Sequence, residues 1–266
     1  MSEHPIAKAV VEKANLKKYL NVKKFKILRG RGVEGMIENK AIVIGNMTLM
    51  NEKKIPVKEF EQDIEKFENE GKTTMIVSEN KKVIGVIAVA DAVKEDSMMA
   101  IRALHKRGYR TVMITGDNER TAQAIAKQVG IKEVIANVLP EDKAKKVEEL
   151  QKRGFVAFVG DGINDAPALK QANVGIAMGT GTDIAIEAGD LVLAKGSLIG
   201  VVQTIELSKA TFSKIKQNLF WAFAYNVIAI PVAVAGLLHP IIAEIAMALS
   251  SITVVTNANL LRRKKI

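Results

Sequence analysis

The chain has 266 residues, 48% of them apolar and 26% charged, so it is a folded protein of about two domains rather than a disordered one. It contains no cysteine, which excludes a disulfide scaffold, a thiolate zinc site and a cysteine nucleophile in this chain. Its 39 basic and 29 acidic residues give a net charge of +10, which indicates an anionic partner, whereas the low aromatic content of 5% argues against nucleic acid.

The first 90 residues are expected to form a small α+β domain. Apolar positions recur at helical spacing over 5–19, with Pro5 at a suitable first helical position. Five short apolar runs that are typical of strands follow, and a polar helix at about 57–70 separates the third run from the fourth.

Three features of this small domain suggest nucleotide contacts, and each also has a plainer interpretation. His4 precedes the first helix, where it could stack on a base or simply be exposed. Gly30 and Gly32 lie between two strands, where they could admit a nucleotide close to the backbone or form a bulge or tight turn. Asn46 follows a strand and could belong to an ordinary turn.

From Asp91 to about residue 208 the pattern changes to alternating strands and helices. Helices are expected at 95–107, 119–129, 141–152 and 165–171, and strands at 111–115 and 156–160, with further strands at EVIA, VGIAM and LVLA. This alternation predicts an α/β domain with a mostly parallel sheet, which places its sites beyond the carboxyl ends of the strands.

Thr115, Gly116 and Asp117, followed by Asn118, come directly after one predicted strand. A hydroxyl group and glycine amides at a strand end can hold a phosphoryl group, although Asp and Asn also form plain capped turns.

A second acidic motif, Gly160-Asp161-Gly162-Ile163-Asn164-Asp165, directly follows the strand at 156–160. Its two carboxylates, four residues apart and beside Asn164, suit Mg²⁺, which prefers hard oxygen ligands; a Gly-Asp turn before a helix is the alternative. Lys143 is expected in the first turn of a helix, where the helix dipole disfavours a cation. A lysine at this position therefore indicates a nearby phosphate. The alternative is a solvated side chain, as for most lysines.

Residues 209–266 are expected to form a transmembrane hairpin, with spans at about 218–238 and 241–261. The first span has no charged residue, the second has only Glu244, and each run is about 20 residues long, enough to cross a bilayer as a helix. A pair of buried core helices is the alternative. Lysines and arginines flank both outer ends, which predicts that these ends and the bulk of the chain are cytoplasmic in a multi-pass protein, with the cell membrane as the expected location. The first residues are too polar for a signal peptide.

The motifs SEHP, TGDN and GDGINDAPAL, in this order and followed by an apolar hairpin, resemble the heavy-metal (type IB) P-type ATPases, in particular the carboxy-terminal portion of the Cu(I)-exporting subgroup. The resemblance covers nearly the whole chain. It implies a haloacid-dehalogenase-like parallel sheet, a nucleotide-binding domain over 1–90, a phosphorylation domain over 91–208 and the last two transmembrane helices.

The resemblance also implies roles for individual residues in binding ATP and a phosphoryl group. The ATP-binding positions are Glu3, His4, Gly30, Gly32 and Asn46. Those around the transferred phosphoryl group are Thr115, Gly116, Asp117 and Lys143, and those that hold Mg²⁺ are Asp161 and Asp165 with Asn164 beside them. Asp91 resembles an aspartate at the hinge between the two domains.

In the membrane, Tyr225 and Asn226 match the copper subgroup's Tyr-Asn pair, and Met247 and Ser251 match its Met-x-x-x-Ser pattern. A thioether ligand favours Cu(I), and Ag(I) is chemically similar. Packing of small residues and a methionine between helices is the alternative. Glu244 stands where the family usually has a small residue, as an exit-side feature or a tolerated interfacial charge.

The chain departs from the family pattern in lacking the DKTGT motif with its phosphoacceptor aspartate, and in lacking the paired membrane cysteines. We therefore expect an incomplete sheet with an exposed edge. The leading interpretation is a fragment of an ATP-driven copper(I) exporter that binds ATP and Mg²⁺ and does not turn over alone. Its expected partners are ATP, a copper ion, the lipid bilayer and the missing amino-terminal part of the pump. The alternatives are a stand-alone, non-catalytic half-subunit or regulator that pairs with a DKTGT-bearing polypeptide, and a soluble haloacid-dehalogenase-type phosphatase.

Overall fold

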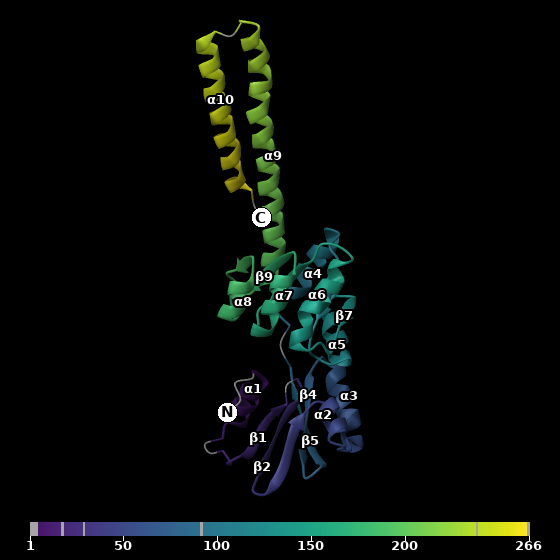
Figure 1. Cartoon of the computed structure of the whole chain (residues 1–266). Coiled ribbons are helices and arrows are strands. Elements are labelled where there is room, and N and C mark those ends of the chain that lie inside the picture. The colour runs from purple at the N-terminus through teal and green to yellow at the C-terminus, as the bar shows by residue number, and fades with distance from the viewer. Residues whose placement is uncertain (1–4, 17–18, 29, 91–92, 238, 265–266) are drawn as a thin grey trace. The chain divides into compact units, whose positions relative to one another are not determined.

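The computed structural model describes residues 5–16, 19–28, 30–90, 93–237 and 239–264 (Figure 1). The chain divides into two compact units, Met1–Ser197 and Leu198–Ile266. Glu3, His4 and Asp91, three of the residues singled out in the sequence, lie outside the described residues. The domain boundaries expected at residues 90 and 208 stay predictions.

The first part of the larger unit is a five-stranded antiparallel sheet in the order β1-β2-β3-β4-β5, the antiparallel-sheet region of residues 23–89 (Figure 1). Its elements are β1 (Lys23–Leu28), β2 (Gly32–Ile37), β3 (Lys40–Gly45), β4 (Thr73–Glu79) and β5 (Lys82–Val89), with α1 (Pro5–Ala14) before them and α2 (Met47–Glu52), the 3₁₀ turn Lys58–Phe60 and α3 (Glu61–Asn69) between β3 and β4. Two-residue turns with positive φ at both positions, 38–39 and 80–81, join β2 to β3 and β4 to β5, as the twist of a hairpin requires.

One face of this sheet packs against α2 and α3. Burial alternates strictly along β4, which places every second side chain in the core. Met50, Ile55, Ile64, Ile76 and Val83 form that core. Full burial of such side chains contributes roughly 1.5–3 kcal/mol each, so these contacts stabilise the region that carries Gly30, Gly32 and Asn46.

The second part, the parallel-sheet region of residues 97–193, alternates strands and helices as the sequence predicts. Its strands are β6 (Val112–Ile114), β7 (Glu133–Ile135), β8 (Ala157–Gly160), β9 (Val174–Met178) and β10 (Leu191–Leu193), and its helices are α4 (Ser97–Lys106), α5 (Glu119–Val129), α6 (Lys143–Gln151), α7 (Ala166–Gln171) and α8 (Asp183–Ala188). All strand pairs are parallel. The predicted fold class is therefore confirmed.

The parallel sheet consists of two separate pieces, β10-β9-β8 and β6-β7. Within the described residues, β8 pairs only with β9 and β6 pairs only with β7, so each has one unpaired edge. Thr115 follows β6 and Asp161 follows β8, so the two acidic motifs both lie at the carboxyl ends of strands with an open edge. An incomplete sheet is what the missing DKTGT segment predicts.

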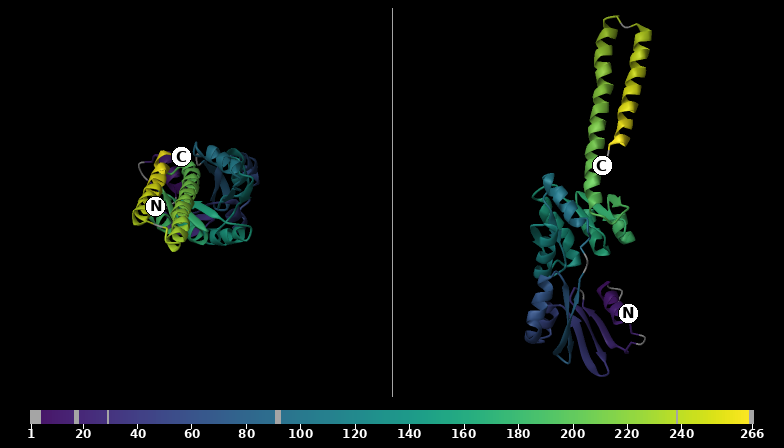
Figure 2. Two further views of the ribbon diagram at one scale, coloured as in Figure 1. Left: turned by 90° about the horizontal axis from the view of Figure 1, so that it is seen from above. Right: turned by 180° about the vertical axis from the view of Figure 1, so that it is seen from behind.

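The smaller unit is a helical hairpin of α9 (Ile199–Val234) and α10 (Pro240–Asn259), ending in the 3₁₀ turn Leu260–Arg263. The two helices run side by side in all the views (Figures 1 and 2). The helix α9 begins well before residue 218, the expected start of the first span. It ends before residue 238 because the chain turns at Gly236, whose φ is +72°. His239 caps the second helix and Pro240 occupies its first position, so this helix begins within one residue of the expected span at 241.

Both helices of the hairpin are long and apolar enough to cross a membrane, with mean hydropathies of 1.3 and 1.6. In neither helix is any of the apolar stretch buried inside the protein. Core helices of a soluble protein would be mostly buried. The alternative of two buried core helices is therefore disfavoured, and the hairpin fits the membrane localisation expected from the sequence.

Candidate functional site

The loop after β6 is organised around Thr115 and Asp117. The Thr115 hydroxyl donates to Asp117 Oδ2 at 2.8 Å, and the Asp117 amide donates back to the same hydroxyl oxygen at 3.1 Å. Asn118 caps α5, because its Oδ1 accepts from the Thr121 amide at 3.0 Å. The motif thus includes the capped turn that the plainer interpretation expected, with a hydroxyl and a carboxylate held together before the helix.

The loop after β8 is organised around Asp165, which is only 8% exposed. Its Oδ1 accepts from Lys143 Nζ at 2.7 Å, and its Oδ2 accepts from the amides of Gly162 and Asp161 at 3.1 and 3.3 Å. A Cβ on Gly160 would lie 2.7 Å from Asp165 Cβ, so only glycine lets the strand end come this close. A buried carboxylate requires such partners, since an unpaired one is costly.

Lys143 is the first residue of α6 and reaches Asp165 from there, with 18% of its side chain exposed. The structure therefore brings together Lys143, Asp161 and Asp165, which are dispersed over 22 residues of sequence. The helix dipole disfavours a cation at this end, and the ion pair with Asp165 offsets that cost. Asn164 lies in the turn between the two aspartates.

In the antiparallel-sheet region, Gly30, Gly32 and Asn46 lie at one end of β2 and β3. Asn46 Nδ2 donates to the Gly30 carbonyl at 3.1 Å, and its Oδ1 caps α2 by accepting from the Leu49 amide at 3.0 Å. Gly32 has a φ of +151°, and a Cβ there would lie 2.1 Å from the Ile44 carbonyl oxygen. These residues form one backbone-lined turn that a side chain at Gly32 would break.

An ion pair on β2 lies close to this turn. Lys53 donates a hydrogen bond to the Glu34 carboxylate, and this bond holds the pKa of Glu34 below its usual value. Because Lys53 balances the charge of Glu34, the pair links the end of α2 to β2 without adding net charge beside the turn.

The four residues predicted as metal ligands lie on the two helices of the hairpin, Tyr225 and Asn226 on α9 and Met247 and Ser251 on α10. The Tyr225 hydroxyl lies 3.4 Å from Thr253 Oγ1, whereas Asn226 Nδ2 donates to the Ala222 carbonyl of its own helix at 2.8 Å. Ser251 Oγ donates to the Met247 carbonyl at 3.2 Å, and Met247 is 75% exposed. The grouping of these four residues around a metal ion therefore stays a prediction.

Three polar contacts that the sequence reasoning missed lie between distant segments. Thr73 Oγ1 donates to Asp117 Oδ1 at 3.0 Å, across 44 residues of sequence. In the hairpin, Asn257 accepts from Lys214 Nζ and donates to Asn218 Oδ1, both at 2.7 Å. None of the three contacts has a local sequence pattern, so only the folded structure reveals them.

A parallel α/β sheet with Thr-Gly-Asp and Gly-Asp-Gly after its strands defines a broad class, the haloacid dehalogenase-like hydrolases. A family model of that description matches residues 1–173, and a second one matches residues 142–205. The chain belongs to the haloacid dehalogenase-like hydrolase family.

More particularly, the chain is homologous over its whole length to proteins named copper-exporting P-type ATPases. It is 50% identical over 268 aligned positions to that of Staphylococcus saprophyticus, covering 100% of this chain and 34% of the relative. The relatives from Staphylococcus aureus strain Newman and Staphylococcus haemolyticus are also 50% identical, with 33% and 34% of their lengths covered. The chain thus spans about a third of the length of these relatives, and the predicted P-type ATPase relationship is confirmed.

Solved structures of similar proteins agree on the fold. A zinc-transporting PIB-type ATPase in the E2.Pi state superimposes with a TM-score of 0.70 at 37% identity, covering 98% of this chain and 42% of that one. The catalytic domain of the CPx-ATPase CopB-B, studied upon nucleotide binding, gives a TM-score of 0.55 at 30% identity, covering 77% of this chain and 73% of that domain.

Proposed function

We propose that this chain is the ATP- and phosphoryl-binding portion of a P-type ATPase that exports Cu(I), together with a membrane hairpin that contributes to the metal path. The proposal rests on one observation: the carboxylate of the buried Asp165 pairs with Lys143 in the loop after β8, which also carries Asp161. Phosphoryl transfer needs positioned positive charge and a held phosphate more than covalent chemistry from the protein, and Lys143, Thr115 and Asp117 are suited to supply both.

Each group of residues has a distinct task in this proposal. The turn at Gly30, Gly32 and Asn46, with Glu3 and His4, would hold the nucleotide. Thr115, with the amides of its loop, would hold the phosphoryl group during its transfer, and Lys143 would neutralise its charge.

The acidic residues fit Mg²⁺ by their chemistry. Asp165 accepts from Lys143 and from two backbone amides, which hold its carboxylate in place, and Asp161 is the second hard oxygen ligand of the motif. Mg²⁺ bound there would neutralise phosphate charge. Asp161 and Asp165 would hold it, and the amides that Asp165 accepts from would keep that carboxylate in place.

The phosphoacceptor is the part that this chain does not carry, since its sequence has no DKTGT motif. The unpaired edges of β6 and β8 support a sheet that is completed by a strand from the amino-terminal part of the pump or from a separate DKTGT-bearing polypeptide. We therefore expect the chain to bind ATP and not to turn it over.

A turnover assay on the pure chain in detergent tests this expectation. We expect no ATP hydrolysis above background, and formation of a phosphorylated, hydroxylamine-sensitive product only after a DKTGT-bearing polypeptide is added. Asp161→Ala should abolish that product. Robust hydrolysis by the pure chain that Asp161→Ala removes would contradict the proposal.

Cu(I) is the proposed transported ion, and Ag(I) is an alternative cargo of similar softness. The names of the staphylococcal relatives and the thioether of Met247 support copper, whereas one structural relative is named zinc-transporting. Tyr225, Asn226 and Ser251 would complete the site with ligands from other helices. The cysteine-free hairpin alone should bind Cu(I) weakly, so tight binding that Met247→Ala abolishes would contradict this assignment.

A further inference from the structure

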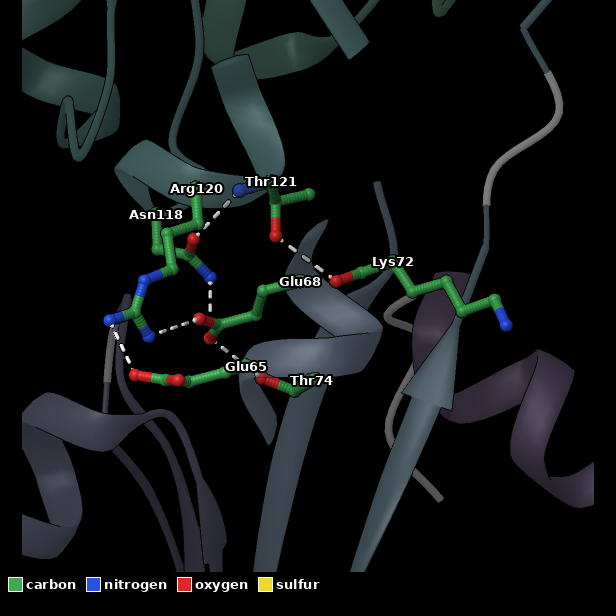
Figure 3. Close-up of polar contacts among 7 residues, drawn as sticks. All are labelled: Glu65, Glu68, Lys72, Thr74, Asn118, Arg120 and Thr121. Atoms are coloured by element: carbon green, nitrogen blue, oxygen red, sulfur yellow. Dashed lines mark hydrogen bonds and ion pairs between the residues drawn. The ribbon is translucent and has the colours of Figure 1, made fainter. Parts of the chain in front are cut away.

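A buried carboxylate joins the antiparallel-sheet region to the helix that follows the phosphoryl-binding loop (Figure 3). Glu68, on α3, is 7% exposed. Its Oε1 accepts from Thr74 Oγ1 and from Asn118 Nδ2, both at 3.0 Å, and its Oε2 lies 3.6 Å from Arg120 Nη1. Thr74 belongs to the same region as Glu68, whereas Asn118 and Arg120 begin α5.

Three further contacts tie the same short segment to the antiparallel-sheet region. Arg120 Nη2 lies 2.7 Å from Glu65 Oε1, and the fully buried Thr121 hydroxyl donates to the Lys72 carbonyl at 3.0 Å (Figure 3). Thr73 donates to Asp117, as described above. Residues 117, 118, 120 and 121 are therefore each held by the neighbouring region.

The burial of Glu68 makes sense only in this docked arrangement. Taking a carboxylate out of water is costly unless ionic or hydrogen-bonding partners replace the solvent. If α5 were not docked, Glu68 would keep only Thr74 of the three partners described above. The exposed Arg120–Glu65 pair is worth little by itself, so most of the specificity comes from the buried bonds of Glu68.

Asn118 is the link between this cluster and the phosphoryl-binding loop. Both polar atoms of its side-chain amide are hydrogen-bonded: Oδ1 caps α5 and Nδ2 donates to Glu68. Asp117 immediately precedes it and is held from the same side by Thr73. A change at Glu68 would therefore remove the bond that orients the capping side chain of Asn118.

We propose that Glu68 is a positioning residue that acts through Asn118 to fix the loop at Thr115–Asn118 and the orientation of the antiparallel-sheet region against α5. The role of Glu68 in binding the phosphoryl group rests on the function proposed above. Its role in orienting the antiparallel-sheet region does not depend on that function, so it can be tested separately.

The chain has no cysteine, so two introduced cysteines give unique labelling sites. We would label Lys82→Cys on β5 and Lys127→Cys on α5, both exposed, and measure the spin–spin distance distribution in the full chain. We expect one narrow distribution in the parent, a broad one in Glu68→Ala and an intermediate one in Glu68→Gln, which retains an acceptor oxygen. The matched control, Glu61→Ala, removes an exposed carboxylate from the same helix and should resemble the parent.

A distribution in Glu68→Ala as narrow as in the parent would overturn the proposal. Arg120→Ala guards against a Glu68 variant that fails to fold, because the Arg120 side chain is 52% exposed and its loss leaves the core intact. We expect it to broaden the distribution as well, and a narrow one would likewise contradict the role of this cluster.

A comparison of ATP and adenosine affinities tests whether Glu68 positions the phosphoryl-binding loop or only stabilises the fold. Glu68→Ala should weaken binding of ATP with Mg²⁺ about tenfold, which corresponds to the coupling energies of linked sites, and leave adenosine binding unchanged. An equal loss of both affinities would mark a structural role and overturn the proposal. If the parent chain binds no ATP, the proposed function fails, and the distance measurement still decides the role of Glu68.

Discussion

Replacement of Asp165 by alanine is expected to cost the chain about 3 kcal/mol of stability, because breaking a buried ion pair leaves one charge uncompensated. Lys143 would lose its carboxylate partner while largely enclosed, and the amides of Gly162 and Asp161 would lose their acceptor. The same change should remove the effect of Mg²⁺ on ATP affinity, because both the cation ligand and the position of Lys143 depend on this carboxylate.

Thermal unfolding and calorimetric ATP titration check both parts of this prediction. Asp183→Ala is the matched control, since Asp183 is exposed in the first turn of α8 and its removal should change neither quantity. An Asp165→Ala chain as stable as the parent, and with the same response to Mg²⁺, would contradict the role assigned to the Lys143–Asp165 pair.

Gly32→Ala is expected to have the second large effect, on the nucleotide-binding turn. The new Cβ would meet the Ile44 carbonyl oxygen at 2.1 Å, and the φ of +151° is one that alanine rarely adopts. Backbone strain of this kind costs on the order of 1–3 kcal/mol, and the clash adds to it. Because β2 and β3 must separate to relieve the contact, Gly30 and Asn46 would move with them, and ATP binding should fall at least tenfold.

Gly85→Ala provides the control in the same sheet. A Cβ at Gly85 would have no heavy atom within 4 Å, and its φ lies outside the strained range. It should leave both the melting temperature and ATP affinity close to those of the parent. Equal behaviour of the two variants would contradict the assignment of a tight backbone turn at Gly32.

The sequence predicted the local elements well, because their signals are local. The strand and helix alternation after residue 95 reflects apolar periodicity, and both acidic motifs lie at strand ends, where the parallel fold places them. The pairing of Lys143 with Asp165 was not predicted, although both were singled out, because it depends on how α6 packs beside α7.

The features that the sequence could not provide are the long-range ones. In the sequence, Glu68 is one of several charged residues on a polar helix. Its burial comes from docking against α5, which the local pattern does not indicate. The first membrane helix begins at Ile199, about five turns before the apolar run, because helix propensity continues through polar residues whereas hydropathy marks only the lipid-spanning part. The grouping of Tyr225 and Asn226 with Met247 and Ser251 stays a prediction.

The most direct test of the proposed function is titration of ATP into the pure, folded chain with and without Mg²⁺, followed by a check for released phosphate. We predict that ATP binds, that Mg²⁺ tightens the binding in a way that depends on Asp161, and that no phosphate is released. A folded chain that binds no ATP, or one that hydrolyses it repeatedly without a DKTGT-bearing partner, would contradict the proposal.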